Sequence, residues 1–149
     1  MQTPDGRPIN DIYEKLYKEH PEILFAVPTW LPPETELREY HFLENAKKIL
    51  FVFGIGDTIF TLEERNIGEE SKLRKSPLDN NEFETKQIYV MNQVGEYTKL
   101  VRENEDISYI AYWNKDRTEY RLKLTGEDEM LFYSIVQGIK EYQPPATSK

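Results

Sequence analysis

The residues of this sequence that could do acid–base or metal chemistry are two histidines and three runs of adjacent carboxylates. His20 and His41 are too few and too far apart for a histidine metal cluster, so we interpret them as a helix-end and a strand side chain. The carboxylate runs are Glu63-Glu64, Glu69-Glu70 and Glu127 to Glu129. A calcium loop needs oxygen ligands at alternate positions, and catalytic carboxylate pairs need unlike environments in one cleft. None of the runs meets these requirements, so we expect no metal ion.

Nucleophilic and phosphate-binding signatures are equally weak. The chain contains no cysteine, and none of its serines sits in the tight strand-to-helix turn that activates a nucleophile. The segment Phe53 to Thr58 holds two glycines after an apolar run, but β-branched Thr58 and Ile59 begin another strand where a phosphate loop needs a helix. The sequence therefore predicts a hairpin turn there, no cofactor, no catalytic residue and no enzymatic activity.

Charge and composition narrow the range of partners. The 149 residues carry 27 acidic against 19 basic side chains, which gives a net charge of -8 and repels phosphate backbones, so we expect no nucleic-acid partner. No stretch approaches the roughly 20 apolar residues that span a bilayer. We expect a chain that is soluble as given and meets a membrane only through an anchor outside this sequence.

Aromatic side chains are the best candidates for binding. Side chains alternate along a strand, so Tyr109 and Trp113 share one face of their strand while Tyr112 takes the other. One interpretation is cross-strand pairing, worth roughly 0.2–1 kcal/mol per pair. The other is a groove between the curved sheet and the helix, lined by Trp30, Tyr112 and Trp113, that takes a partner peptide or an apolar ligand.

A basic cluster is the second candidate. Lys72, Arg74 and Lys75 fall in the segment 65–86, where apolar residues are few and turn-forming residues dominate. Long loops either carry function or remain disordered. We interpret the cluster either as a solvated loop or as part of the same partner-binding surface.

The elements that would hold these residues follow from hydrophobic periodicity. Apolar positions at helical spacing predict a short helix from Asn10 to Pro21, and the proline-rich segment Val27 to Pro33 predicts an extended covering segment. Period-two alternation with turn residues between the runs predicts strands at 36–43, 48–53, 58–64, 87–91, 97–103, 107–113 and 118–124. A wide apolar stripe predicts a final helix over 126–142, capped by Thr125.

These elements indicate a single α+β domain over residues 10–142, with a flexible start (1–9) and a tail (143–149). We expect a curved antiparallel sheet of about six to seven strands. The C-terminal helix packs on this sheet, and a short helix lies at the N-terminus.

The order of these motifs resembles a domain of unknown function. That domain occurs in the extracytoplasmic regions of Gram-positive membrane proteins, among them anti-sigma factors and sporulation-associated lipoproteins. The segment Val27–Leu37 is similar to its P-x-Y-L-P-E-G-Y opening through Pro28 to Pro32, although Pro33-Glu34-Thr35 replaces the Glu-Gly-Tyr. Further matching segments, within a resemblance that covers residues 24–142, are Ile49–Arg65, Ile88–Leu100, Trp113, Tyr120–Leu122 and the final helix.

The resemblance implies a non-enzymatic, sensor-like regulatory or interaction module, held at the envelope by a membrane anchor and binding a protein partner. It transfers no catalytic residues. Two alternatives stay open at this point: a carrier of lipid or another apolar ligand, and a cytosolic or phage-encoded accessory protein that binds a host protein. The identity of the partner, the signal sensed and the oligomeric state do not follow from the sequence.

Overall fold

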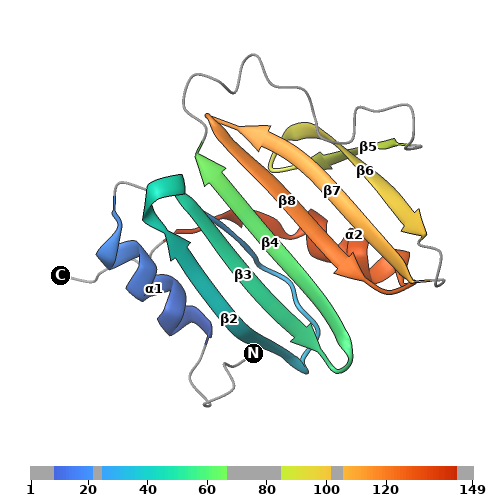
Figure 1. The fold of residues 1–149 in the computed structure, drawn as a ribbon, viewed down its shortest axis with the longest axis horizontal. Coiled ribbons are helices and arrows are strands. Elements are labelled where there is room, and N and C mark those ends of the chain that lie inside the picture. Colours follow the sequence, from blue (N-terminus) through green and yellow to red (C-terminus); the bar gives the residue numbers. More distant parts are fainter. Residues whose placement is uncertain (1–8, 22–24, 67–84, 102–105, 144–149) are drawn as a thin grey trace.

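A computed structural model describes residues 9–21, 25–66, 85–101 and 106–143 (Figure 1). One antiparallel sheet dominates it, with the strand order β2-β3-β4-β8-β7-β6-β5. Its strands are β2 (Thr35–Leu43), β3 (Lys48–Ile55), β4 (Thr58–Asn66), β5 (Lys86–Val90), β6 (Gln93–Val101), β7 (Ile107–Lys115) and β8 (Thr118–Thr125). The remaining elements are α1 (Ile9–Glu19), a 3-10 turn (Glu44–Ala46), α2 (Glu129–Gln137) and the short strands β1 (Ala26–Pro28) and β9 (Ile139–Glu141). The predicted α+β class is confirmed.

Two meanders meet at the centre of the large sheet. Strands β2 to β4 form one and β5 to β8 form the other, and they join where β4 pairs with β8. Two of the hairpins close with two left-handed residues each, Met91-Asn92 and Asp116-Arg117. Such turns match the twist of the flanking strands. Every neighbouring pair is antiparallel, as the turn residues predicted.

Gly95 lies inside β6, whereas the predicted strands 87–91 and 97–103 left it in the turn between them. A Cβ atom at this position would lie 2.7 Å from the carbonyl oxygen of Tyr112 and 2.8 Å from Cβ of Trp113. Glycine therefore allows the backbone of β6 to lie this close to its neighbour β7. β6 therefore begins at Gln93, before the predicted start at residue 97.

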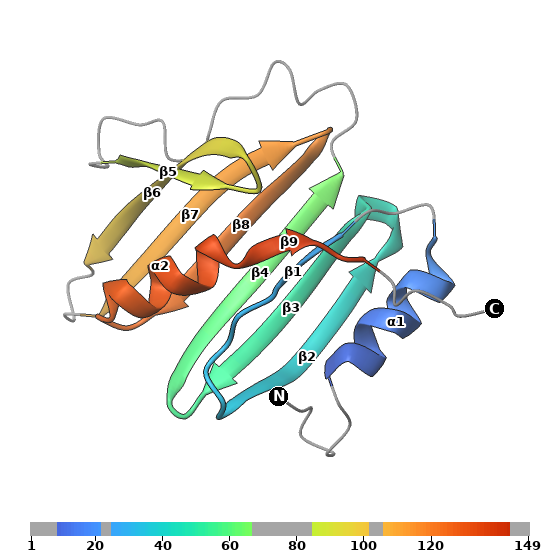
Figure 2. The same ribbon diagram turned by 180° about the vertical axis from the view of Figure 1, so that it is seen from behind.

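One face of the sheet carries a covering layer, which Figure 2 shows as β1, β9 and α2 lying in front of the strands, with α1 beside β2 at the edge of the sheet. The core lies between the layers. From the sheet it takes Phe51, Phe60, Leu62, Trp113, Leu122 and Leu124, and from α2 it takes Phe132, Ile135 and Val136, all with at most 1% exposure. Burial of each such side chain stabilises the fold by roughly 1.5–3 kcal/mol.

The helix α2 is shorter than predicted at both ends. Asp128, not Thr125, is its N-cap, and Asp128 Oδ1 accepts a hydrogen bond from the Leu131 N–H at 3.0 Å. Thr125 remains in β8, and Gly126, with φ at 137°, donates its N–H to the carbonyl of Ile107. The predicted cap, Thr125, is used instead in strand pairing, so the helix begins three residues later.

At its other end α2 stops at Gln137, and residues 139–141 form β9 instead of continuing the predicted helix to Tyr142. A Cβ atom on Gly138 would lie 3.2 Å from the backbone nitrogen of Trp30, so the chain passes close to the segment after β1. β9 then pairs antiparallel with β1. Ile139 is buried in β9, and the predicted helix would bury it too. The apolar stripe therefore did not distinguish a helix from a strand at this position.

Candidate functional site

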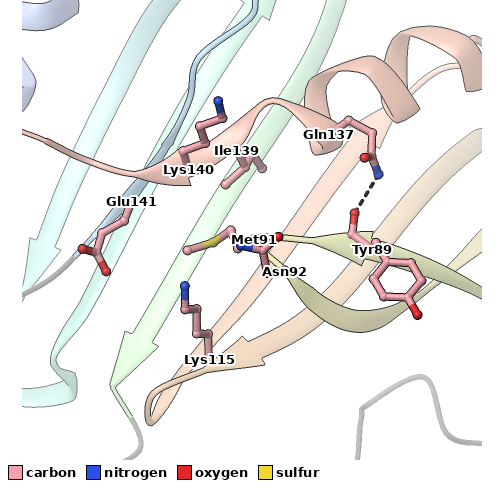
Figure 3. A pocket seen from close by; sticks show the side chains of 8 residues that line it. All are labelled: Tyr89, Met91, Asn92, Lys115, Gln137, Ile139, Lys140 and Glu141. Atoms are coloured by element: carbon pink, nitrogen blue, oxygen red, sulfur yellow. Dashed lines mark hydrogen bonds between the residues drawn. The ribbon is translucent and has the colours of Figure 1, made fainter.

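A pocket of about 330 Å³ lies between the covering layer and the tips of two hairpins (Figure 3). It is lined by Tyr89, Met91, Asn92, Lys115, Gln137, Ile139, Lys140 and Glu141. The end of α2 and β9 form one wall, while the β5–β6 hairpin and the end of β7 form the other. Its volume is at the lower end of the range for ligand sites, roughly 300–1,000 Å³.

Two side-chain contacts hold the hairpin wall in place. Gln137 Nε2 donates to the backbone carbonyl of Tyr89 at 2.7 Å and ties α2 to the edge strand β5. The Trp113 indole N–H donates to Met91 Sδ at 3.4 Å, from beneath the hairpin. Met91 and Asn92 both have positive φ, so the tight turn brings both side chains to the pocket.

The opposite wall exposes a strand edge. Thr29 N–H donates to the Gly138 carbonyl, and Tyr142 N–H donates to the Phe25 carbonyl, which sets the alternation of hydrogen bonds between β1 and β9. By that alternation, the N–H and C=O groups of Ile139 and Glu141 point away from β1, on the side of the pocket. They form no hydrogen bond with any other described residue. β9 therefore carries an open edge.

The pocket is more basic than the chain as a whole. Two of its lining residues are lysines, Lys115 and Lys140, against the single carboxylate of Glu141. Within the described residues, neither lysine forms an ion pair. A net positive lining in a chain of charge -8 favours an anionic group as occupant.

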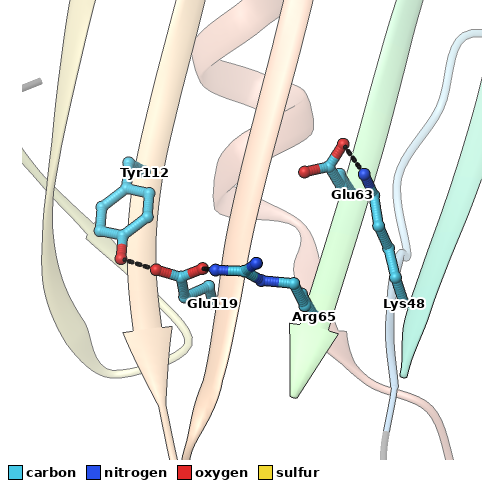
Figure 4. A network of polar contacts seen from close by, with 5 residues as sticks. All are labelled: Lys48, Glu63, Arg65, Tyr112 and Glu119. Carbon is cyan, nitrogen blue, oxygen red and sulfur yellow. Dashed lines mark hydrogen bonds and ion pairs between the residues drawn. The ribbon is translucent and has the colours of Figure 1, made fainter. Parts of the chain in front are cut away.

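The opposite face of the sheet holds a polar network (Figure 4). Arg65 contacts Glu119 at 2.8 Å, and the Tyr112 hydroxyl donates to the other oxygen of Glu119 at 2.7 Å. Beside them, Lys48 Nζ lies 3.0 Å from Glu63 Oε1. Each of these pairs joins neighbouring strands across a face that meets solvent, which is the usual arrangement for an antiparallel sheet covered on one side.

The three predicted aromatic residues lie apart from one another. Tyr112 and Trp113 point to opposite faces of β7, as the alternation predicted, and both are buried. Trp113 stacks on Tyr120 with ring centroids 5.3 Å apart, so its ring fills the core. Both residues border a small pocket of about 190 Å³ beside Gly95, but Trp30 is not among the residues that line it. Of the three, only Trp30 is exposed, at 48%. Lys72, Arg74 and Lys75 lie outside the described residues.

Sequence reasoning missed most of the pocket. Lys140 fell within the predicted helix and Lys115 within a predicted turn, so neither carried a signal for binding. Tyr89 belonged to the strand aromatics, but nothing local indicated that it would be 63% exposed. The pocket exists because β9, from the end of the chain, meets hairpins formed much earlier in it.

One ionisable group is buried in the core. Glu64 on β4 is 3% exposed, and its Oε1 accepts a hydrogen bond from the Ala26 N–H at 2.6 Å. Burial holds the pKa of this carboxyl well above its usual range, and the hydrogen bond opposes that shift in part. Burial, together with the charge of Glu64, also raises the pKa of Tyr13 and Tyr120.

Comparison with known proteins gives no match: no family model, no curated protein and no solved structure is similar to this chain. Among the described residues, no group of three or more His, Asp or Glu side chains is placed to hold a metal ion. Neither of the two described helices has the length and apolar composition of a membrane span.

Proposed function

We propose that this chain is a non-enzymatic interaction domain that binds a protein partner through the surface around the pocket. The observation that carries this proposal is the open edge of β9, which borders a pocket, together with exposed apolar side chains on α2 and after β1. Met130 is 78% exposed, Tyr133 44% and Trp30 48%. Exposed apolar groups around a recess are typical of protein-binding surfaces.

The positions of these side chains support one continuous surface. Met130, Tyr133 and Gln137 recur at three and four residues, so they share one side of α2. Gln137 lines the pocket, and Trp30 packs against Gly138 at the end of the same helix. A partner resting on α2 would therefore reach the pocket and the edge of β9.

The cellular setting rests on the sequence resemblance. Its ordered motifs support a sensor-like regulatory domain on the outside of a Gram-positive cell, attached through a membrane or lipid anchor, as in anti-sigma factors and sporulation-associated lipoproteins. Fractionation of cells producing the native full-length protein tests this. Recovery in the cytosol would contradict it and favour the accessory-protein alternative.

A carrier of lipid is less well supported by the pocket. Three of its eight lining residues are charged, whereas pockets for apolar ligands are lined mainly by hydrophobic side chains. Native mass spectrometry of the protein purified from its own cells separates the two functions. A co-purified lipid would favour the carrier.

Site-specific photo-crosslinking tests the proposed surface. A benzophenone amino acid at Tyr133 should capture one discrete protein in cells. The same amino acid at Ile59, which is 40% exposed on the opposite face of the sheet, should capture none. The two positions have similar exposure, so the difference reports on location. Equal products from both positions, or no product from Tyr133, would contradict the proposal.

A further inference from the structure

We infer that the pocket takes an extended, acidic segment of the partner protein, which adds to the open edge of β9 as the third strand of the β1–β9 sheet. This inference rests on the proposed function and specifies the chemistry of its partner. It depends on two independent features of the pocket, namely the outward backbone groups of β9 and the two lysines, which have no hydrogen-bonded or ion-pair partner among the described residues.

The backbone groups define the geometry. Ile139 and Glu141 together offer two N–H donors and two C=O acceptors on the side away from β1. An added strand pairs with such groups through main-chain hydrogen bonds, and pockets beside the edge read its side chains. β9 is also held firmly, because its other edge is bonded to β1 and the Ile139 side chain is buried in the core. Little ordering is then needed on this side of the interface.

The other exposed edges differ from that of β9. The edge strand β2 has a bulge between Leu37 and Glu39 and carries the charged residues Arg38 and Glu39 there, features that prevent strand addition. On β5, the carbonyl of Tyr89 already accepts from Gln137. The edge of β9 has neither a bulge nor a side chain bonded to it among the described residues.

The lysines define the composition of the segment. Lys140 lies on β9 itself, and Lys115 reaches the pocket from the end of β7 (Figure 3). A carboxylate on the exposed face of the added strand would meet the Lys140 ammonium, and the positive charge of Lys115 would attract the segment from within the pocket. Its alternate side chains would contact the Tyr89 ring and Met91, so we expect acidic and apolar residues to alternate.

A blocked octapeptide of alternating valine and glutamate is a suitable probe. On titration, the amide protons of Ile139 and Glu141 should exchange with solvent at least tenfold more slowly, measured by NMR. N-methylation of every second residue removes the donors of one edge of the peptide. One of the two possible N-methylated peptides should lose at least tenfold in affinity, while the other should bind as before.

Charge reversal tests the lysines. The double variant Lys115→Glu and Lys140→Glu should weaken binding of the probe at least tenfold. The matched variant Lys15→Glu and Lys47→Glu changes the net charge equally at exposed sites on α1 and before β3, and should leave the affinity unchanged. Circular dichroism and thermal unfolding establish that both variants fold.

Several results would overturn the inference. They are equal binding of a valine–lysine octapeptide, unchanged exchange at Ile139 and Glu141, reproduction of the effect by acetate alone, or occupation of the edge by a second copy in a concentration-dependent dimer. If crosslinking at Tyr133 captures a partner but the octapeptide does not bind to β9, the proposed protein binding is supported and strand addition is ruled out. If the peptide adds to β9 but Tyr133 captures nothing, the proposed function fails instead.

Discussion

The two outer edges of the small β1–β9 sheet differ in whether their backbone groups are hydrogen-bonded. On β1 the Ala26 N–H points into the core and is bonded by Glu64, while Pro28 has no N–H to satisfy. On β9 the corresponding groups of Ile139 and Glu141 point to the pocket and have no partner among the described residues. An edge that faces the core must therefore be closed, whereas an edge that faces a surface pocket can stay open for a partner.

Closing the first edge is costly. A buried carboxyl group is destabilising unless its oxygens are hydrogen-bonded, and Glu64 Oε2 has no partner among the described residues. The nearby Tyr13 hydroxyl is in the same condition. The raised pKa of Glu64 is the direct consequence, because the neutral form is easier to bury than the anion.

The largest effect should come from proline at the two paired positions of these edges. Ala26 and Glu141 are paired in register, and the N–H of each points away from the other strand. Ala26→Pro removes the buried donor to Glu64 and places a ring against its carboxyl, so it should lower the free energy of unfolding by about 3 kcal/mol. Glu141→Pro removes a donor that has no partner among the described residues, so it should cost less than about 1 kcal/mol. Urea denaturation measures both. Similar losses would mean that the edges are equivalent.

A smaller loss of unfolding free energy should follow from a side chain at Gly95, where the backbone of β6 lies close to β7. Gly95→Ala places a methyl group against the Tyr112 carbonyl and the Trp113 side chain, which should cost about 2 kcal/mol because the backbone must shift. Gly56→Asn is the control: it has open space and a left-handed φ that asparagine accepts, so it should cost less than about 0.5 kcal/mol. A tolerated Gly95→Ala would show that β6 does not need its close crossing.

The smallest expected change, counted per pH unit, is in the free energy of unfolding as Glu64 titrates. A raised folded-state pKa means that the stabilisation is complete below the unfolded pKa, about 4.3, and is lost as pH rises towards the folded value. Relative to Glu64→Gln, the wild type should lose up to about 1.4 kcal/mol of unfolding free energy per pH unit in that window. Denaturation of both proteins from pH 4 to pH 8 measures the difference. Parallel curves would show that Glu64 does not titrate there.

Strands were the easiest elements to predict, because alternation reports directly which face is buried. Segments such as Lys48–Ile55 and Thr118–Thr125 carry that alternation in their own residues. The end of α2 was predicted wrongly because a buried isoleucine at position 139 suits a helix and a strand equally. The choice was made by β1, which lies more than 100 residues earlier in the chain.

The candidate site was harder to predict than the fold. Alternation correctly separated Tyr112 from Trp113, yet both rings are buried, and aromatic content alone does not tell a core ring from a binding ring. Lys115 and Lys140 come together only through the folded sheet. Of the predicted binding residues within the described ranges, Trp30 alone stays exposed.

Local patterns determined the secondary structure of most of the chain, the turns between its strands and the amphipathic helix that covers the sheet, because each depends on neighbouring residues. The tertiary structure alone decided that Glu64 is buried, that the chain after Gly138 becomes a strand, and that one edge of that strand stays open beside two lysines. Each of these depends on segments far apart in the sequence, and which groups are desolvated follows only from how those segments pack.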